Sequence, residues 1–309
     1  MKGSRDSLSL LLFLLVQTDI SPQNDSPTDA ARWSAIQRKV QEHNVLQAFA
    51  LFRENGIEPI LIKGLAAAVN YPDSMHRPSI DMDLAVAASN FQSASVFANG
   101  LPANGLAIDL HMELRHFDTL SWADLFSRSQ QIKTEVGSYR VLCPEDHLRV
   151  LAVHWLNDGG VNRERLWDIC YLIENRSADF DWDRALNVVS PRRRRWILCT
   201  IGLAHRYLGL DLSGTPVAID AADLPEWLTK TVEREWKNGV KLFPLWAVLR
   251  DRVKLWQQLK LRINPNPIRA TIEMEGSFDA RTRIFYKVGN FFQRLSPSLK
   301  RNVETIKQR

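Results

Sequence analysis

The chain has 309 residues, of which 45% are hydrophobic and 24% are charged, and its formal net charge is +5. This size and apolar content allow one large domain or two modest ones, each with its own buried core. The three cysteines, Cys143, Cys170 and Cys199, stand far apart with no CxxC pair. Neither a disulfide framework nor a zinc site is therefore indicated, and we expect a globular, cytoplasmic protein.

The N-terminus combines two basic residues with an apolar run. Lys2 and Arg5 precede residues 8–16, which have the length of the hydrophobic region of a signal peptide. A small-residue cleavage site does not follow, and about 20 apolar residues are needed to cross a bilayer. We interpret the run as part of a buried helix and expect no membrane partner.

Helical periodicity dominates residues 30–55, and Gly56 follows as a helix stop. The apolar stripe of this helix consists of Trp33, Ile36, Val40, Val45, Leu46, Phe49 and Phe52. The short β-branched run 57–64 then predicts a strand that ends in a glycine turn, and residues 65–71 predict a short helix.

Residues 80–86 alternate between acidic and apolar side chains, with Asp81 and Asp83 on one face, as in a half-buried strand. Two aspartates separated by one residue on a strand have Cα atoms about 6–7 Å apart. Magnesium takes oxygen ligands and is commonly held by one or two carboxylates together with substrate phosphates. This strand is therefore a candidate magnesium site.

A helix is expected over residues 89–99, followed by a second alternating strand over 106–114 that places Asp109, His111 and Glu113 on one face. A third carboxylate from a neighbouring strand completes a site for paired ions, which lie about 3.5–4 Å apart. Asp109 is the best candidate, because it stands on the next predicted strand with polar partners on the same face. Three buried carboxylates would repel one another without cations. We interpret His111 as a support for the metal ligands rather than as a base, and Glu113 can simply face solvent.

From Pro144 onward the pattern is helical almost to the end, with loop signals between helices. Residues 250–309 contain fourteen Lys and Arg against five Asp and Glu, so the basic character of the chain is concentrated there. Such a segment can contact a polyanion, although solvated outer faces of helices are the more common explanation. Arg192 to Arg195 follow Ser190-Pro191 and form the charged first turn of a predicted helix.

Several motifs occur together along the chain. Ile62-Lys63-Gly64, Tyr71 and Arg77 precede the run Asp81-Met82-Asp83-Leu84-Ala85-Val86, and Asp109-Leu110-His111 follows. Pro144-Glu145-Asp146 with His154, and Leu166-Trp167-Asp168-Ile169, lie further on. This set spans roughly residues 30–210 and resembles an uncharacterised nucleotidyltransferase family of the DNA polymerase β-like nucleotidyltransferase superfamily.

The resemblance implies roles for individual residues. It assigns Asp81 and Asp83 as metal ligands and Asp109 as the third carboxylate, which can also act as base toward an acceptor hydroxyl. All three are thus both catalytic and metal-binding, with two Mg²⁺ ions expected and Mn²⁺ as an alternative. The nucleotide-binding residues are Lys63, Gly64 and Arg77: a lysine neutralises phosphate charge, and a glycine lets the backbone approach the triphosphate closely.

The expected fold class is α+β, with a polymerase β-like nucleotidyltransferase core, a small mixed sheet flanked by helices, and a helical C-terminal region. We divide the chain into N-terminal helices packing on the core (1–55), the core itself (56–143), a helical region (144–262) and a basic C-terminal segment (263–309). The twenty-five residues between Asp83 and Asp109 are fewer than is usual in the family, which predicts a shortened or missing element between the two strands.

The function implied is metal-dependent transfer of a nucleoside monophosphate from a nucleoside triphosphate to an acceptor, with release of pyrophosphate. No residue selects ATP over the other triphosphates, and the acceptor can be a protein, a small molecule, a sugar phosphate or RNA. Two alternatives stay open. One is a catalytically silent nucleotide-binding or protein-binding module of the same fold, and the other is a metal-dependent phosphohydrolase.

Overall fold

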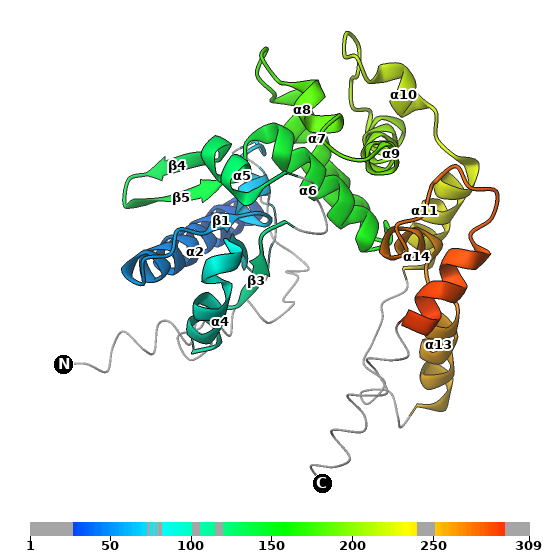
Figure 1. The fold of residues 1–309 in the computed structure, drawn as a ribbon, viewed down its shortest axis with the longest axis horizontal. Helices are drawn as coiled ribbons and strands as arrows, with labels where there is room; N and C mark the ends of the chain where they lie inside the picture. The colour runs from blue at the N-terminus through cyan, green and yellow to red at the C-terminus, as the bar shows by residue number, and fades with distance from the viewer. Residues whose placement is uncertain are drawn as a thin grey trace. The chain divides into compact units, whose positions relative to one another are not determined.

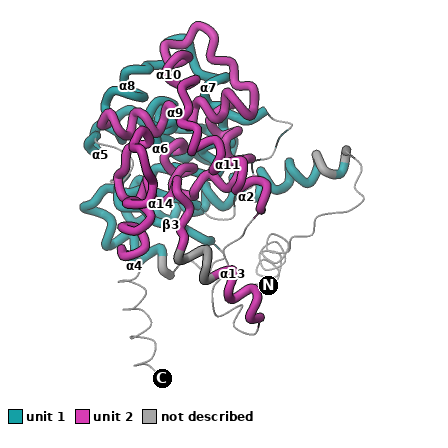
Figure 2. The backbone as a smooth tube through the Cα atoms, turned by 90° about the vertical axis from the view of Figure 1, so that its right-hand side faces the viewer, with its two compact units in different colours: residues 1–150, 171–188 teal, residues 151–170, 189–309 magenta. Residues whose placement is uncertain are grey.

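The computed structural model describes residues 27–72, 75, 77, 79, 82–100, 106–114, 120–239 and 251–293. The apolar run 8–16 and Asp81 lie outside these residues. The chain forms two compact units (Figure 2): unit 1 comprises residues 1–150 and 171–188, and unit 2 comprises 151–170 and 189–309. The four-segment division made from the sequence stays a prediction.

Unit 1 is built on a five-stranded mixed sheet (Figure 1) with strand order β3-β2-β1-β5-β4. The strands are β1 (Ile60–Leu61), β2 (Met82–Val86), β3 (Ile108–Met112), β4 (Gln130–Thr134) and β5 (Gly137–Val141). The pairs β1/β5 and β2/β3 are parallel, and β1/β2 and β4/β5 are antiparallel. The predicted α+β class with a small mixed sheet is confirmed.

Helices cover both faces of this sheet and make up the described part of unit 2. Those that begin in unit 1 are α2 (Pro27–Glu54), α3 (Leu65–Ala68), η1 (Ala88–Asn90), α4 (Phe91–Gly100), α5 (Trp122–Arg128), α6 (Pro144–Asn157) and α8 (Trp182–Leu186). Those that begin in unit 2 are η3 (Arg163–Leu166), α7 (Trp167–Glu174), α9 (Pro191–Leu208), α10 (Ala218–Ala222), α11 (Glu226–Asn238), α13 (Arg252–Ile263) and α14 (Pro267–Glu273). Among the described helices, none combines the length and the apolar character that crossing a membrane requires.

Helix α2 packs on one face of the sheet through its C-terminal half. Phe49 and Phe52 are fully buried and Val45 is 3% exposed, and burying each such side chain contributes about 1.5–3 kcal/mol. Trp33 and Ile36, which the sequence placed in the same stripe, are 44% and 49% exposed. The predicted helix is thus confirmed, but its N-terminal turns contribute little to the core.

Strand β2 is buried on both faces, which corrects the prediction of a half-buried strand. Met82, Leu84 and Val86 join the core cluster that includes α2 and α4 residues. Ala85, on the opposite face, joins a second cluster with residues of β1, α5 and α6. Because an apolar cluster covers each face of β2, neither face is left to solvent, and Asp83 is only 5% exposed.

The segment between β2 and β3 contains η1 and the ten-residue helix α4. Parallel strands need a crossover of a dozen or more residues, usually with a helix, and this segment provides it. An element is therefore present where the short spacing suggested that one could be missing. The crossover sets the parallel register in which Asp83 and Asp109 are Cα partners.

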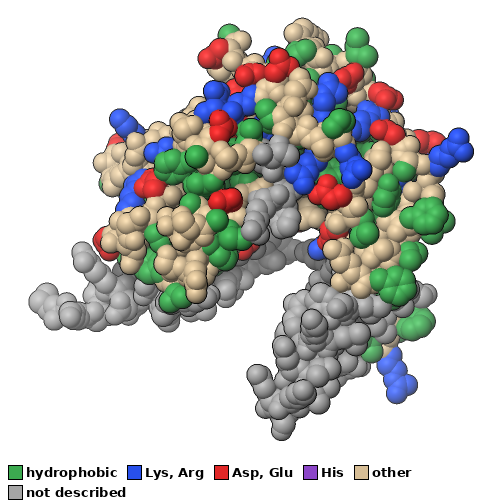
Figure 3. All heavy atoms as spheres, viewed as in Figure 1, with side chains coloured by type: hydrophobic (Ala, Val, Ile, Leu, Met, Phe, Trp, Pro, Cys, Tyr) green, Lys and Arg blue, Asp and Glu red, His purple; other side chains and the backbone are tan. Residues whose placement is uncertain are grey.

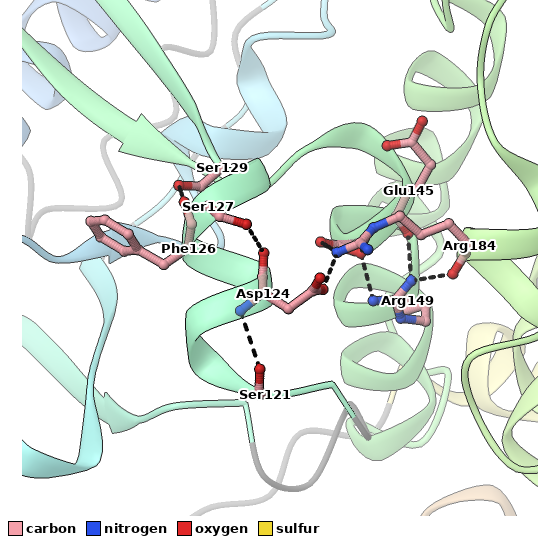
Figure 4. Close-up of polar contacts among 9 residues, drawn as sticks. Ser121, Asp124, Phe126, Ser127, Ser129, Glu145, Arg149 and Arg184 are labelled. Atoms are coloured by element: carbon pink, nitrogen blue, oxygen red, sulfur yellow. Dashed lines mark hydrogen bonds and ion pairs between the residues drawn. The ribbon is translucent and has the colours of Figure 1, made fainter.

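A cluster of charged side chains joins α5, α6 and α8, and Figure 4 shows Asp124, Arg149 and Arg184 of this cluster. Asp146 is fully buried and accepts hydrogen bonds from Arg149 Nη2 at 2.6 Å, Arg184 Nε at 2.9 Å and Arg184 Nη2 at 2.7 Å. Arg184 Nη2 also reaches Asp124 Oδ2 at 2.9 Å. Arg149 Nη1 donates to the Arg184 carbonyl at 2.6 Å, so the two arginines are fixed to each other as well as to the carboxylate.

The pKa of Asp146 reflects this cluster. Burial disfavours the charged form and raises the pKa, but the hydrogen bonds from Arg184 and the charge of Arg149 outweigh it, so the pKa lies below its ordinary value. The ionised carboxylate is therefore the form that stabilises the fold.

The arginine run of unit 2 forms the first turns of α9, as predicted, and Ser190 caps this helix by accepting from Arg193 N at 3.3 Å. All four arginines contact acidic residues of unit 2. Arg192 donates to the backbone carbonyl of Glu275, whereas Arg193 pairs with the Glu275 carboxylate, Arg194 with Asp220, and Arg195 with Asp223 and Asp279. Acidic and basic side chains are likewise interspersed on the face shown in Figure 3. The run thus has a structural role in unit 2.

We predict that Asp146→Asn lowers the free energy of unfolding by about 3–5 kcal/mol, because the buried Arg149 loses its counter-charge and Arg184 keeps only its ion pair with Asp124. Urea unfolding followed by circular dichroism measures this. Asp179→Asn, an exposed aspartate of the same unit, is the matched control and should change little. Equal stability of the two variants would contradict a stabilising role of the cluster.

The Asp146 carboxylate should also affect how the free energy of unfolding changes at acidic pH. A depressed folded pKa means that the contribution of Asp146 is complete above the unfolded value of about 3.9 and is lost as the pH falls through the folded pKa. The stability difference between wild type and Asp146→Asn should therefore shrink as the pH falls below about 4. Urea titrations between neutral and acidic pH test this, and a difference that grows toward acid would contradict it.

Candidate functional site

Two carboxylates meet where β2 and β3 run side by side. Asp83 and Asp109 are Cα partners in the parallel register, and alternation along each strand turns both away from the face covered by α2 and α4. With His111 they offer ligand atoms that all lie within 4.8 Å of one another. Asp83 is buried, whereas the Asp109 side chain is 57% exposed, so the cluster opens toward solvent on the Asp109 side.

His111 lies between the two carboxylates. Its Nε2 is 3.1 Å from Asp83 Oδ1 and 3.4 Å from Asp109 Oδ2. An ionised carboxylate only accepts hydrogen bonds, so the contact with Asp83 requires a proton on Nε2. In this arrangement His111 draws the two carboxylates together, as expected of a residue that supports metal ligands.

Lys63 reaches the same carboxylate from the end of β1. Backbone pairing continues one residue past β1, with Ile62 N donating to Asp83 O at 3.1 Å, so Lys63 follows directly beside Asp83. Lys63 Nζ forms an ion pair with Asp83 Oδ1, and the two side chains are only 12% and 8% exposed. The predicted phosphate-binding lysine thus contacts the predicted metal ligand.

Gly64 makes the turn that follows. Its φ of 64° and ψ of −119° lie in a region that side chains with a Cβ rarely adopt. The chain then enters α3 at Leu65. A glycine is required at this position to bring Lys63 to the sheet and to let the chain turn away at once.

Opposing effects set the pKa of Asp83. Burial favours the neutral acid and raises the pKa, while the hydrogen bond from His111 and the positive charge of Lys63 lower it. The cationic and donor partners prevail, and the pKa lies below its ordinary value. Asp83 is therefore ionised at neutral pH, as a metal ligand must be.

A histidine that the sequence did not single out holds the Lys63 turn in place. His147 on α6 is 2% exposed, and its Nε2 lies 3.1 Å from the Ile62 carbonyl oxygen. This bond fixes the backbone immediately before Lys63. The contact spans 85 positions, so no local pattern reveals it; the only signal was the helix start at Pro144-Glu145-Asp146.

Three further residues were predicted at or near the site. Arg77 is 4% exposed, and Asp81 lies outside the described residues. Glu113 has a φ of 55°, and its Oε1 accepts from Ala88 N at 3.0 Å. The structure therefore brings together Lys63, Asp83, Asp109 and His111, whereas Glu113 fastens the end of β3 to the start of η1.

Comparison with known proteins adds a family to this geometry. Residues 90–209 match the family model of an uncharacterised nucleotidyltransferase. This match supports the family-level prediction over the matched residues. The matched region includes Asp109 and His111 and begins after β2. No curated protein matches the chain. A nucleotidyltransferase family implies general nucleotidyl transfer and a nucleotide substrate.

We predict that Gly64→Ala destabilises the fold by about 1–3 kcal/mol, the cost of a strained backbone conformation. It should also weaken Mn²⁺ binding, because the backbone before the turn pairs with Asp83 and a shift there moves the Asp83 carboxylate relative to Asp109. Urea unfolding and Mn²⁺ titration measure the two effects. Gly209→Ala, also at positive φ but with open space where the added methyl group would lie, is the control and should leave Mn²⁺ binding unchanged. Unaltered Mn²⁺ binding by Gly64→Ala would contradict the role of this turn.

Proposed function

We propose that this protein is a metal-dependent nucleotidyltransferase whose active site is the junction of β1, β2 and β3. The observation that supports it best is the convergence of Asp83 and Asp109 in one parallel register, with His111 between them and Lys63 beside them. This arrangement belongs to a chain that matches a nucleotidyltransferase family. Asp81 is proposed as a further carboxylate of the same site.

The donor set fits a divalent cation. Asp83 and Asp109 offer oxygen ligands, which suit Mg²⁺ and Mn²⁺. Because the His111 Nε2 proton points at Asp83, His111 supports the ligands through its hydrogen bond rather than through a lone pair on the same atom. We therefore keep Mg²⁺, with Mn²⁺ as the alternative, and two ions as the proposed number. Bound there, the cation would neutralise phosphate charge and activate the acceptor.

The proposed reaction joins an acceptor oxygen to the α-phosphorus of a nucleoside triphosphate. The bond between this phosphorus and the oxygen that leads to the β-phosphate breaks, and pyrophosphate leaves. The acceptor hydroxyl gives its proton to Asp109, whose exposed carboxylate can reach a bound substrate. Phosphoryl chemistry depends mainly on positioning and charge neutralisation. The other proposed site residues position the substrate or neutralise its charge.

Lys63 and Gly64 are proposed to contact the triphosphate, the lysine through its charge and the glycine by permitting close backbone approach. Arg77 is proposed as a further phosphate-binding residue. The acceptor is a protein, a small molecule, a sugar phosphate or RNA, and the basic segment 263–309 is a proposed contact for a polyanion.

We predict that Asp83→Asn and Asp109→Asn each abolish the Mg²⁺ dependence of nucleotide binding. The loss should exceed the roughly 10–100-fold typical of residues that only support a ligand. The measurement is a Mg²⁺ titration with each of the four nucleoside triphosphates. Asp179→Asn serves as control, and Asp109, being exposed, gives a variant that should fold normally. Mg²⁺-dependent binding that survives both substitutions would overturn the proposed site.

The products separate transfer from its alternatives. Pyrophosphate release with label retained on an acceptor supports the transferase, whereas nucleoside monophosphate without labelled acceptor indicates a phosphohydrolase. Nucleotide binding with no turnover for any acceptor class indicates a silent module of the same fold.

A further inference from the structure

The carboxylate proposed to bind a divalent cation already holds a cation of the protein. Lys63 Nζ is paired with Asp83 Oδ1, and His111 Nε2 lies 3.1 Å from the same oxygen. Both side chains of the ion pair are nearly buried, so water screens it only weakly. The oxygen that a divalent ion needs is the one that Lys63 occupies.

An ammonium group and a divalent cation cannot share this oxygen without strong repulsion. Binding of the ion therefore requires Lys63 to leave. The ammonium sits on a flexible four-carbon stem, so it can move while its backbone stays fixed by the Ile62 contact with His147. Once displaced, it lies in a largely buried place without a counter-charge, which is costly.

We propose that Lys63 is an exchangeable counter-ion, which neutralises Asp83 in the ligand-free protein and moves to the triphosphate when a divalent cation takes its place. This inference rests on the proposed function. The exchange couples the two ligands: the ion frees Lys63 for the nucleotide, and the nucleotide removes the competitor of the ion. Such coupling is reciprocal, and it keeps the site charge-balanced in both states.

The decisive variant is Lys63→Met, tested with Mn²⁺ alone. Because Met removes the competing charge and keeps much of the side-chain volume, Mn²⁺ should bind at least about tenfold more tightly than to wild type, the lower end of what a neighbouring charge does to a carboxylate. Triphosphate binding should become weaker in the same variant. A lysine that only binds phosphate would leave Mn²⁺ affinity unchanged, and that result would overturn the exchange.

Two further variants frame the measurement. Lys63→Arg should bind Mn²⁺ more weakly than wild type, because a guanidinium pairs with a carboxylate through two hydrogen bonds and is harder to displace. Lys133→Met, at an exposed position on β4 of the same unit, should bind Mn²⁺ as wild type does. If Lys63→Met does not fold, tighter or equal Mn²⁺ binding by Lys63→Arg overturns the proposal.

Wild-type protein allows a test without any substitution. Acetic anhydride modifies free amines, and peptide mass mapping reports the extent at each lysine. Lys63 should react slowly alone, faster with Mn²⁺ and slowly again with Mn²⁺ plus a non-hydrolysable triphosphate analogue, while Lys133 stays constant. Unchanged reactivity on adding Mn²⁺ at saturating concentration would overturn the exchange.

The two proposals fail in different ways. Tighter Mn²⁺ binding by Lys63→Met, together with no binding of any triphosphate by wild type, would overturn the proposed function and leave only the displacement of Lys63 by the ion. Mg²⁺-dependent triphosphate binding with unchanged Mn²⁺ affinity in Lys63→Met would support the function and overturn the exchange.

Discussion

The ionised carboxylate of Asp146 is the interaction on which the geometry of the candidate site depends. It is fully buried and held by Arg149 and Arg184, which fixes the N-terminal turns of α6 against α8. The next residue on α6, His147, contacts the Ile62 carbonyl. The charged cluster around Asp146, which is separate from the Asp83–Asp109 pair, thus determines the position of Lys63.

Such an arrangement explains why a costly ionic cluster sits inside unit 1. Removing charges from water carries a penalty that ion pairing only partly offsets, so a buried cluster is weak evidence for stability gained over an apolar core. Here the cluster fixes orientation, because hydrogen bonds to a carboxylate have preferred angles and apolar contacts do not. Helix α6 needs a defined orientation, because a small rotation would carry His147 away from Ile62.

Local patterns in the sequence were sufficient for the elements that carry the site. The periodicity of α2, the alternation in β2 and β3 and the glycine turn at Gly64 follow from side-chain spacing alone. The β4–β5 hairpin was not predicted. Most of its residues are exposed or partly exposed, and they mix polar and apolar types, so they show no clear alternation. The two-sided burial of β2 was also missed, since alternation shows that two faces differ and does not show what covers each.

Long-range contacts account for the rest of what local patterns could not reveal. The Asp83–Lys63 ion pair joins a residue of β2 to one that follows the end of β1, and it depends on the antiparallel register of these strands. Likewise, Arg184 meets Asp124 and Asp146 across 60 and 38 positions. Each of these residues alone looks like an ordinary surface charge, and only folding shows which charges are removed from water together.

The parallel pairing of β2 and β3 makes the site sensitive to the length of the segment that contains α4. Side chains alternate across a strand, so a slip of one residue in β3 would move Asp109 and His111 to the face covered by α2 and α4 and bring Leu110 beside Asp83. That slip would also bury two polar side chains in an apolar cluster and expose Ile108, which packs there. The hydrophobic pattern of β3 therefore penalises the wrong register and, by the same contacts, selects the one in which the carboxylates meet.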